Sequence, residues 1–252
     1  LIIGESIIDE YQFCSVMGKS GKEPVLVALH NRTEQYIGGA LAIANHVANF
    51  CDHVCLVSAL GTLDTFEEFI AAKLHRNIAP HFIRLPGAPT ILKRRFLEEY
   101  QAVKLFEVYV MRNDAALAEK EAEFCRELES RLSQYDVVIV ADYGHGLMGD
   151  RAVRLVCENA RFLAVNTQTN AGNRGLNTIS KYPRADYVSI GEPEVRLDTR
   201  RAVGDIRDLA KGLAEKIATR NFVVTRGSAG CVVHDRQRSE EHTSELQSPN
   251  TI

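Results

Sequence analysis

The stretch Tyr135–Gly144, YDVVIVADYG, decides the fold class. Its run Val137–Ala141 is apolar at every position, which is typical of a strand buried on both faces, and an acid, Asp142, follows it directly. Similar runs occur along the chain: LIIGES (1–6), HVCLVSALG (53–61), ARFLAVNTQ (160–168), ADYVSIGEP (185–193) and NFVVTRGS (221–228), the last followed by a glycine turn and a second strand. These runs predict a sheet that is covered on two sides.

Amphipathic segments separate these runs and predict helices. They cover residues 40–50, 65–76, 114–133, 150–159 and 205–219. In the last segment, Ile206, Leu209, Leu213 and Ile217 recur at helical spacing, with charged residues on the opposite face. Strands that alternate with helices predict an α/β fold with a doubly wound, mostly parallel sheet. In such sheets ligands bind at the carboxyl ends of the strands, so the residues that follow each run are the candidates for function.

Two segments, at about 12–37 and 88–111, break this alternation. Both have strand-like alternation without a helix between their strands, as in EPVLVALHNRTEQYI (23–37) and PTILKRRFLEEYQAVKLFEVYVM (89–111). We expect them to form a small antiparallel β lid over the carboxyl edge of the main sheet. Exposed strand edges are usually covered or paired, so we also expect a homodimer through the lid.

Composition excludes some classes of function. The net charge of −3 gives no sign of a nucleic-acid partner. Apolar runs such as Val137–Ala141 are far shorter than the roughly 20 residues of a membrane helix, so we expect no membrane segment. The six cysteines lie in predicted helices and strands and indicate core thiols and a cytoplasmic location. Cys51, His53 and Cys55 are the alternative, a partial metal site.

Three local patterns suggest a site for a sugar or for a small anion such as phosphate. Asp9 follows the first strand, where its carboxylate either accepts hydrogen bonds from sugar hydroxyls or begins a loop. Gly38 and Gly39 precede a helix, where backbone approaches a ligand closely or simply turns. Strand alternation directs Lys93 and Arg95 to the same side, either toward a phosphate or toward solvent.

The order of these patterns resembles a known family. The series is Gly4-(x)4-Asp9, Glu23-Pro24-Val25, Gly38-Gly39, Pro89-Thr90-(x)2-Lys93, Asp142-Tyr143 and Thr225-x-Gly227. It resembles the ribokinase-like carbohydrate kinases of the phosphofructokinase-B type, and within them it looks most like the kinases that phosphorylate a heptose 7-phosphate. The resemblance implies ATP-dependent phosphorylation of a sugar or sugar phosphate with Mg²⁺.

The resemblance also implies roles for individual residues. Asp9, Gly38 and Gly39 would hold sugar hydroxyls, and Lys93 and Arg95 would bind a substrate phosphate. Asp142 would lie near the transferred phosphoryl group and is a possible catalytic residue. Glu194 matches the acid of the family's Asn-x-x-Glu motif and would help to bind Mg²⁺. The nucleotide would lie beside Asn166, Thr225 and Gly227.

The chain departs from the family pattern at four positions. Ala42 replaces an asparagine, His145 replaces the lysine of Asp-Tyr-x-Lys-Gly, Asn166-Thr167 replaces Asp-Pro, and Gly191 replaces the asparagine of Asn-x-x-Glu. These departures concern the sugar and the metal rather than the fold. They leave open a second hypothesis, a metabolite-binding sensor without catalysis.

A rival motif is Gly144-x-Gly146-x-x-Gly149, which follows a predicted strand and precedes a predicted helix, as in a dinucleotide-binding fingerprint. That fingerprint requires an acid at the end of the next strand to bind ribose, and Asn166 stands there. NAD(P) binding is therefore the weaker alternative.

The last stretch, Arg238–Ile252, has neither strand alternation nor a helical stripe. Back-translated, its RSEEHTSELQS resembles a sequencing adapter, so we interpret 238–252 as a non-native tail and 1–237 as a truncated kinase domain. A polar disordered tail is the alternative. In the family the catalytic base lies in a Gly-Ala-Gly-Asp segment, which we expect after Gln237, so the chain as printed is predicted to be inactive. A fused nucleotidyltransferase domain beyond that point is a third hypothesis.

Overall fold

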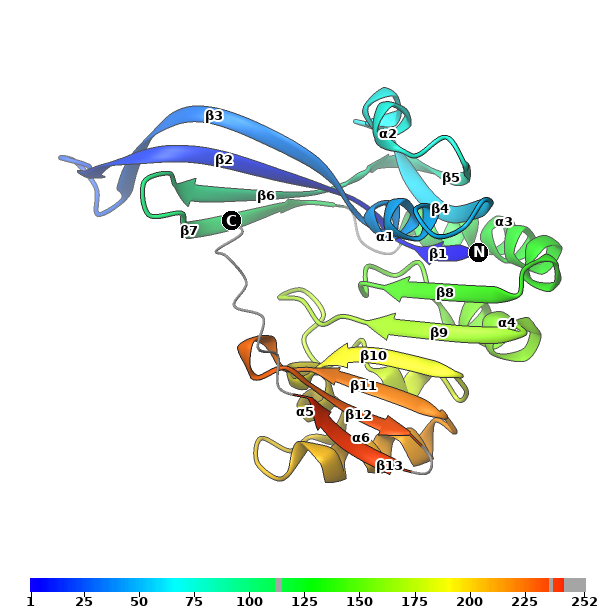
Figure 1. The fold of residues 1–252 in the computed structure, drawn as a ribbon. Helices are drawn as coiled ribbons and strands as arrows, with labels where there is room; N and C mark the ends of the chain where they lie inside the picture. Colours follow the sequence, from blue (N-terminus) through cyan, green and yellow to red (C-terminus); the bar gives the residue numbers. More distant parts are fainter. Residues whose placement is uncertain (112–114, 236–237, 243–252) are drawn as a thin grey trace.

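A computed structural model describes residues 1–111, 115–235 and 238–242 (Figure 1). Its main sheet has nine strands in the order β13-β12-β11-β10-β9-β8-β1-β4-β5. Neighbouring strands from β5 to β11 are parallel, while β12 and β13 are antiparallel to their neighbours. In chain order the strands are β1 (Ile2–Gly4), β4 (Val54–Leu63), β5 (Ile78–Pro89), β8 (Val137–Asp142), β9 (Phe162–Thr167), β10 (Tyr187–Gly191), β11 (Asn221–Thr225), β12 (Cys231–Asp235) and β13 (Arg238–His242). The predicted doubly wound, mostly parallel sheet is confirmed.

In the described part of the chain, six α-helices pack on this sheet and create two hydrophobic cores. The helices are α1 (Ala40–Ala48), α2 (Glu67–Lys73), α3 (Ala115–Arg131), α4 (Asp150–Asn159), α5 (Glu192–Thr199) and α6 (Ile206–Lys216). Ile2 and Ile3 of β1 point to opposite faces, Ile2 into the core under α1 and α2 and Ile3 into the core shared by α3 to α6. Among the described residues the core under α1 and α2 reaches no further along the sheet than β8.

The lid is a second sheet of four strands in the order β3-β2-β6-β7. It consists of β2 (Ser6–Lys19), β3 (Leu26–Gly39), β6 (Ile91–Glu98) and β7 (Val103–Val110), and it extends away from the carboxyl ends of the main strands (Figure 1). The hairpins β2–β3 and β6–β7 are antiparallel, but β2 and β6 pair in parallel. The lid is therefore not antiparallel throughout, because each hairpin leaves the main sheet in the same direction.

Several elements differ from the sequence prediction. The lid begins at Ser6 rather than near residue 12, so Asp9 lies within β2 instead of in a loop after the first strand. β5 and α5 were not predicted, because β5 contains prolines and α5 is only two turns long. Residues 238–242 form the edge strand β13 beside β12, since backbone pairing requires no particular side chains.

The cysteines and the polarity of the helices bear on two further expectations. Cys14, Cys55, Cys125 and Cys157 are buried free thiols, whereas Cys51 is exposed and Cys231 half-buried, so the expectation of core thiols fails at those two positions. No helix in the described part of the chain is both long and apolar enough to span a membrane.

Candidate functional site

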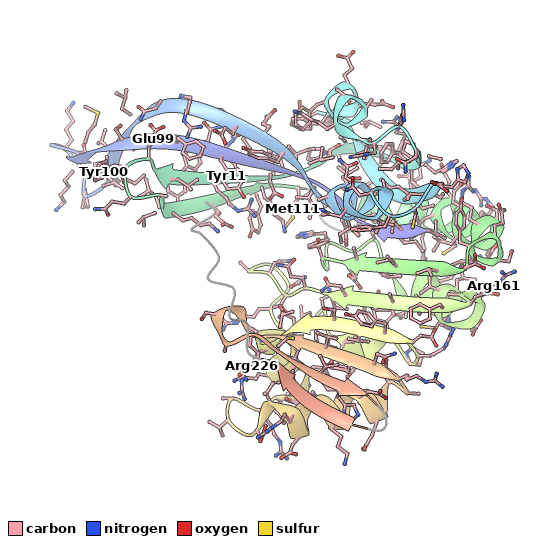
Figure 2. The ribbon with its side chains drawn as sticks, in the orientation of Figure 1. Tyr11, Glu99, Tyr100, Met111, Arg161 and Arg226 are labelled. Carbon is pink, nitrogen blue, oxygen red and sulfur yellow. The ribbon has the colours of Figure 1, made fainter. Side chains whose placement is uncertain are left out.

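The parallel strands bring the predicted site residues to one edge of the main sheet. Gly4 pairs with Ala141, Ala141 with Asn166, and Gly191 with Thr225, so the strand ends stand in one row. Figure 2 shows Met111 at the base of the lid and Arg226 on this carboxyl edge, while Arg161 lies at the opposite edge. The carboxyl edge and the base of the lid therefore form one region.

Asp9, Lys93 and Arg95 meet on the lid side of this region. Asp9 is the register partner of Lys93 between β2 and β6. The Asp9 carboxylate forms an ion pair with Arg95, which also donates to Glu107 at 3.1 Å. Burial disfavours the Arg95 cation, but the hydrogen bond to Asp9 and the charges of Asp9, Tyr11 and Glu107 together outweigh it, so the pKa of Arg95 is raised. Arg95 is thus already neutralised by two acids.

Local packing explains why glycine is required at positions 38 and 39. A Cβ at Gly38 would overlap the Asp9 carboxylate, so this glycine leaves room for the acid. Gly39 has a φ of 59° and directly precedes α1, and a Cβ there would overlap the carbonyl oxygen of Glu5. Both glycines are required by the positions of Asp9 and Glu5 even without a ligand.

Lys93 is the buried cation of the region. It is only 7% exposed, and its Nζ lies 5.2 Å from the centre of the Tyr109 ring and 5.8 Å from that of Tyr143. Among the described residues no carboxylate lies within ion-pair distance of this ammonium. Burial lowers the pKa of Lys93, and the nearby Asp9 only partly opposes this shift.

Asp142, at the end of β8, is buried and fully engaged by protein groups. Its side chain is 1% exposed, and Oδ2 accepts from Tyr182 at 2.6 Å and pairs with Lys181 at 2.5 Å. Oδ1 accepts from the backbone N–H of Gly144 at 3.0 Å and from Asn177 at 3.1 Å. These contacts favour a role in holding the structure over proton transfer, for which a base must reach its substrate.

Sequence reasoning missed Glu5. This acid lies between β1 and β2, is 3% exposed, and accepts hydrogen bonds from the backbone N–H groups of Tyr143 at 2.9 Å and His145 at 3.0 Å. Burial, with a contribution from the Asp142 carboxylate, raises the pKa of Glu5 to about 7. The sequence signal was a charged residue inside the largely apolar run LIIGESII.

The turn Tyr143–Gly146 explains the glycine motif without a dinucleotide. Its N–H groups at Tyr143 and His145 are bound by Glu5 and that at Gly144 by Asp142, so they are not available to a pyrophosphate. A Cβ at Gly144, where φ is 68°, would overlap Asn173 and Asn177. These contacts disfavour the alternative of NAD(P) binding.

The imidazole of His145 lies in the same turn and has no hydrogen-bond partner at its buried Nε2 among the described residues. Burial and the nearby Lys93 lower the pKa of His145 to about 4, so the ring is neutral at physiological pH. His145 lines a polar cavity of about 320 Å³ together with Met111, Gly144, Gly146, Met148, Asn170, Gly172, Asn173, Leu176, Asn177 and Lys181.

The residues expected near the nucleotide occupy the next strand ends. Asn166 donates to the carbonyl of Ser189 at 2.6 Å, and Thr225, exposed at the end of β11, donates to that of Ile190 at 3.5 Å. Gly227 has a φ of 57° in the turn that follows. Glu194, in the first turn of α5, accepts from the N–H of Thr169 at 3.1 Å.

Metal binding by protein groups alone has little support here. The described residues contain no cluster of three or more His, Cys, Asp or Glu side chains that could hold a metal ion. This covers both Glu194 and the Cys51–His53–Cys55 alternative, in which Cys55 is buried and Cys51 exposed. Gln237, after which the native catalytic-base segment was expected, lies outside the described residues, and the strand Arg238–His242 that follows it belongs to the stretch interpreted as a non-native tail.

A family model described as pfkB family carbohydrate kinase matches residues 1–250. The chain belongs to the pfkB family of carbohydrate kinases. Curated relatives include the bifunctional protein HldE of Shewanella amazonensis, 24% identical over 244 residues, and that of Bradyrhizobium diazoefficiens, 27% identical over 249 residues. Each alignment covers 96% of this chain and 49% of the relative. The chain thus spans about half the length of these pfkB relatives.

Solved structures of pfkB kinases share the fold. Phosphofructokinase-2 from Escherichia coli, in complex with substrates and products, superimposes with a TM-score of 0.73 at 12% identity, covering 98% of this chain and 80% of the enzyme. A ribokinase from Thermotoga maritima gives a TM-score of 0.68 at 16% identity, covering 98% and 78%. The predicted ribokinase-like fold is confirmed.

Proposed function

We propose that this protein catalyses ATP-dependent phosphorylation of a sugar phosphate, and that Lys93 binds the phosphate the substrate already bears. The buried ammonium of Lys93, which pairs with no acid in the described part of the chain, is the observation that supports this best. A buried cation is costly unless an anion accompanies it, and a phosphate would supply that anion at the base of the lid. Arg95 would contribute only after releasing Asp9 or Glu107, so we assign the larger share to Lys93.

Asp9 would hold the sugar through the carboxylate oxygen that faces Gly38, since its other oxygen faces Arg95. The sugar would then lie between the lid and the carboxyl edge, with the acceptor hydroxyl directed toward the ends of β8 to β11. Aligning that hydroxyl with the γ-phosphate is the main task of a kinase, since phosphoryl transfer depends chiefly on positioning and charge neutralisation.

ATP would lie along the ends of β9 to β11, beside Asn166, Thr225 and Gly227. Mg²⁺ would arrive with the nucleotide, because this ion keeps most of its ligands from phosphates and water and needs only one or two protein carboxylates. Glu194 fits that need, since Thr169 engages one of its oxygens. The bound ion would neutralise charge on the phosphates.

The relatives are named bifunctional, and a kinase half within a longer protein is consistent with the coverage of about half their length. A metabolite-binding sensor is the second candidate, favoured by the engagement of Asp142 and by the neutral His145. Both candidates predict sugar-phosphate binding, and only a kinase consumes ATP.

The decisive experiment titrates hexose and heptose phosphates, and the matching unphosphorylated sugars, into the protein by calorimetry and then measures ADP release with ATP and Mg²⁺. We expect the phosphorylated sugars to bind more tightly, with ADP release that depends on the sugar phosphate. Equal affinity for phosphorylated and unphosphorylated sugars would overturn the role of Lys93. Binding without ADP release, both in this chain and in a form with any native residues that follow Gln237, would favour the sensor.

We also propose that two copies associate through the lid. Several large apolar side chains of β2 and β3 are exposed: Val16, Met17, Leu26, Val27 and Leu29. An exposed apolar patch beside strand edges is typical of a protein interface.

A further inference from the structure

The buried carboxylate of Glu5 links the start of the lid to the turn at the end of β8. Glu5 itself stands between β1 and β2, and its two oxygens accept from Tyr143 at 2.9 Å and His145 at 3.0 Å. These hydrogen bonds join residues that are 138 and 140 positions apart in the chain. The acid is 3% exposed, so water does not compete for these bonds.

The carbonyl groups of the same turn are bound by amide side chains. Asn170 donates to the carbonyl of Tyr143 at 2.8 Å, and Asn173 donates to the carbonyl of Gly144 at 2.9 Å. Glu5 and Asp142 therefore bind the N–H groups of the turn while the asparagines bind its carbonyls. This arrangement fixes Tyr143, whose ring faces Lys93, and His145, which lines the polar cavity.

We propose that Glu5 is a positioning residue for the kinase, holding the turn Tyr143–Gly146 so that Tyr143 and His145 stay beside Lys93, and that protonation of Glu5 releases this turn. The proposal rests on the proposed function for its effect on turnover, but not for the hydrogen bonds themselves. An ionised carboxylate accepts both N–H groups, whereas a protonated one carries an O–H that is a donor and loses acceptor capacity on that oxygen.

The charged surroundings of Glu5 set the pH at which this occurs. Asp142 disfavours the ionised form, as does burial, and the two backbone hydrogen bonds favour it, which leaves the pKa of Glu5 at about 7. Lys93 faces the same space from β6, where Glu5 acts on it, and Tyr143 and His145 face it from the turn. His145, with its pKa lowered to about 4, and Tyr143, with its pKa raised to about 12, do not change charge between pH 6 and 8.

The test compares wild type with Glu5→Gln, which is nearly isosteric and cannot titrate. Glu10→Gln is the matched control, because Glu10 is also buried on β2 and accepts from Gln12, Gln35 and Arg94 but not from the turn. In wild type and the control we expect the backbone amide ¹⁵N resonances of Tyr143 and His145 to titrate with a midpoint near pH 7. In Glu5→Gln we expect them not to titrate between pH 6 and 8.

Turnover provides the second readout, measured in this chain and in a form with any native residues that follow Gln237. We expect kcat/KM for the sugar phosphate to rise about tenfold from pH 6 to pH 8 in wild type and Glu10→Gln, and to be low and flat in Glu5→Gln. If the wild-type amides titrate but kcat/KM does not depend on pH, the hydrogen bonds of Glu5 to the turn would be supported and its positioning role would be wrong. If the wild-type amides show no titration near pH 7, the proposal fails even if Glu5→Gln does not fold. Absence of turnover in every variant would contradict the proposed function, while the amide titration would still decide the proposal on Glu5.

Discussion

The lid and the carboxyl edge of the main sheet hold their charged groups in opposite ways. On the lid, side chains neutralise one another across adjacent strands, as Asp9, Arg95 and Glu107 do. At the edge, Glu5 and Asp142 are buried, and much of their hydrogen bonding is to backbone N–H groups. From this difference we infer that charged side chains of the lid can give up a protein partner to bind a ligand. At the edge, the buried carboxylates instead hold a turn in one shape. Lys93 lies between the two systems and is paired with neither.

Neutralising Asp142 at the carboxyl edge of the main sheet should have the largest effect on stability. In Asp142→Asn we expect the free energy of unfolding to fall by about 3 kcal/mol, because the Lys181 ammonium loses its buried partner. Urea unfolding measures this change. Asp136→Asn is the control, since its pair with Arg161 is exposed and should contribute less than about 1 kcal/mol. An unchanged stability together with lost turnover would instead identify Asp142 as the base.

Removing the unpaired cation of the lid should affect binding rather than folding. We expect Lys93→Met to raise the dissociation constant of a sugar phosphate ~10²-fold, because the substrate phosphate loses a buried cation, while methionine keeps a side chain of similar length beside the Tyr109 and Tyr143 rings. Calorimetry should show affinity for ATP changed less than twofold. Lys104→Met removes an exposed lid lysine and should leave both affinities unchanged. An equal loss of affinity for ATP and sugar would contradict the assignment.

The two regions should also respond to pH with opposite signs. The pKa of Glu5 is raised from 4.5 to about 7, so its contribution to stability is complete below pH 4.5 and is lost as the pH rises through 7. Relative to Glu5→Gln, wild type should lose about 2 to 3 kcal/mol between pH 4.5 and 8. Unfolding in urea across this range measures the difference.

Glu10 on the lid supplies the contrasting case. Burial alone would raise its pKa, but hydrogen bonds from Arg94, Gln35 and Gln12 outweigh burial and lower it. Its contribution is therefore present above pH 4.5 and lost as the pH falls, so wild type should gain stability with pH relative to Glu10→Gln. If the stability difference between wild type and variant changed with pH in the same direction for Glu5→Gln and Glu10→Gln, the proposed difference between lid and edge would be wrong.

The smallest effect concerns the lid as an interface. Leu29 is 58% exposed on β3, and we expect Leu29→Asp to weaken self-association about tenfold, since a charge would replace apolar surface in a shared interface. Analytical ultracentrifugation measures the dimer. Leu176→Asp, at an 83% exposed leucine far along the chain from the lid, is the control. Wild type that remains monomeric at micromolar concentration would refute the lid dimer.

Local patterns in the sequence determined the fold class and much of the lid. Apolar runs such as Val137–Ala141 and the helical spacing of Ile206, Leu209 and Leu213 depend only on near neighbours, because strands and helices bury faces with fixed periods. The same alternation placed Lys93 and Arg95 on one side of a strand, and both lie beside Asp9. The order of the motifs also predicted the family, and the match of the pfkB family model over residues 1–250 confirms that prediction.

Only the tertiary structure decided how the site residues are engaged. Nothing near Asp142 in sequence indicates that Lys181 and Tyr182 hold its carboxylate, about 40 residues away. Nothing near Glu5 indicates that its partners are the N–H groups of Tyr143 and His145. Likewise, nothing near Lys93 in sequence indicates that no acid of the described residues pairs with it. The physical reason is that burial and charge pairing depend on which distant segments the sheet brings together, whereas periodicity depends on the chain's own geometry.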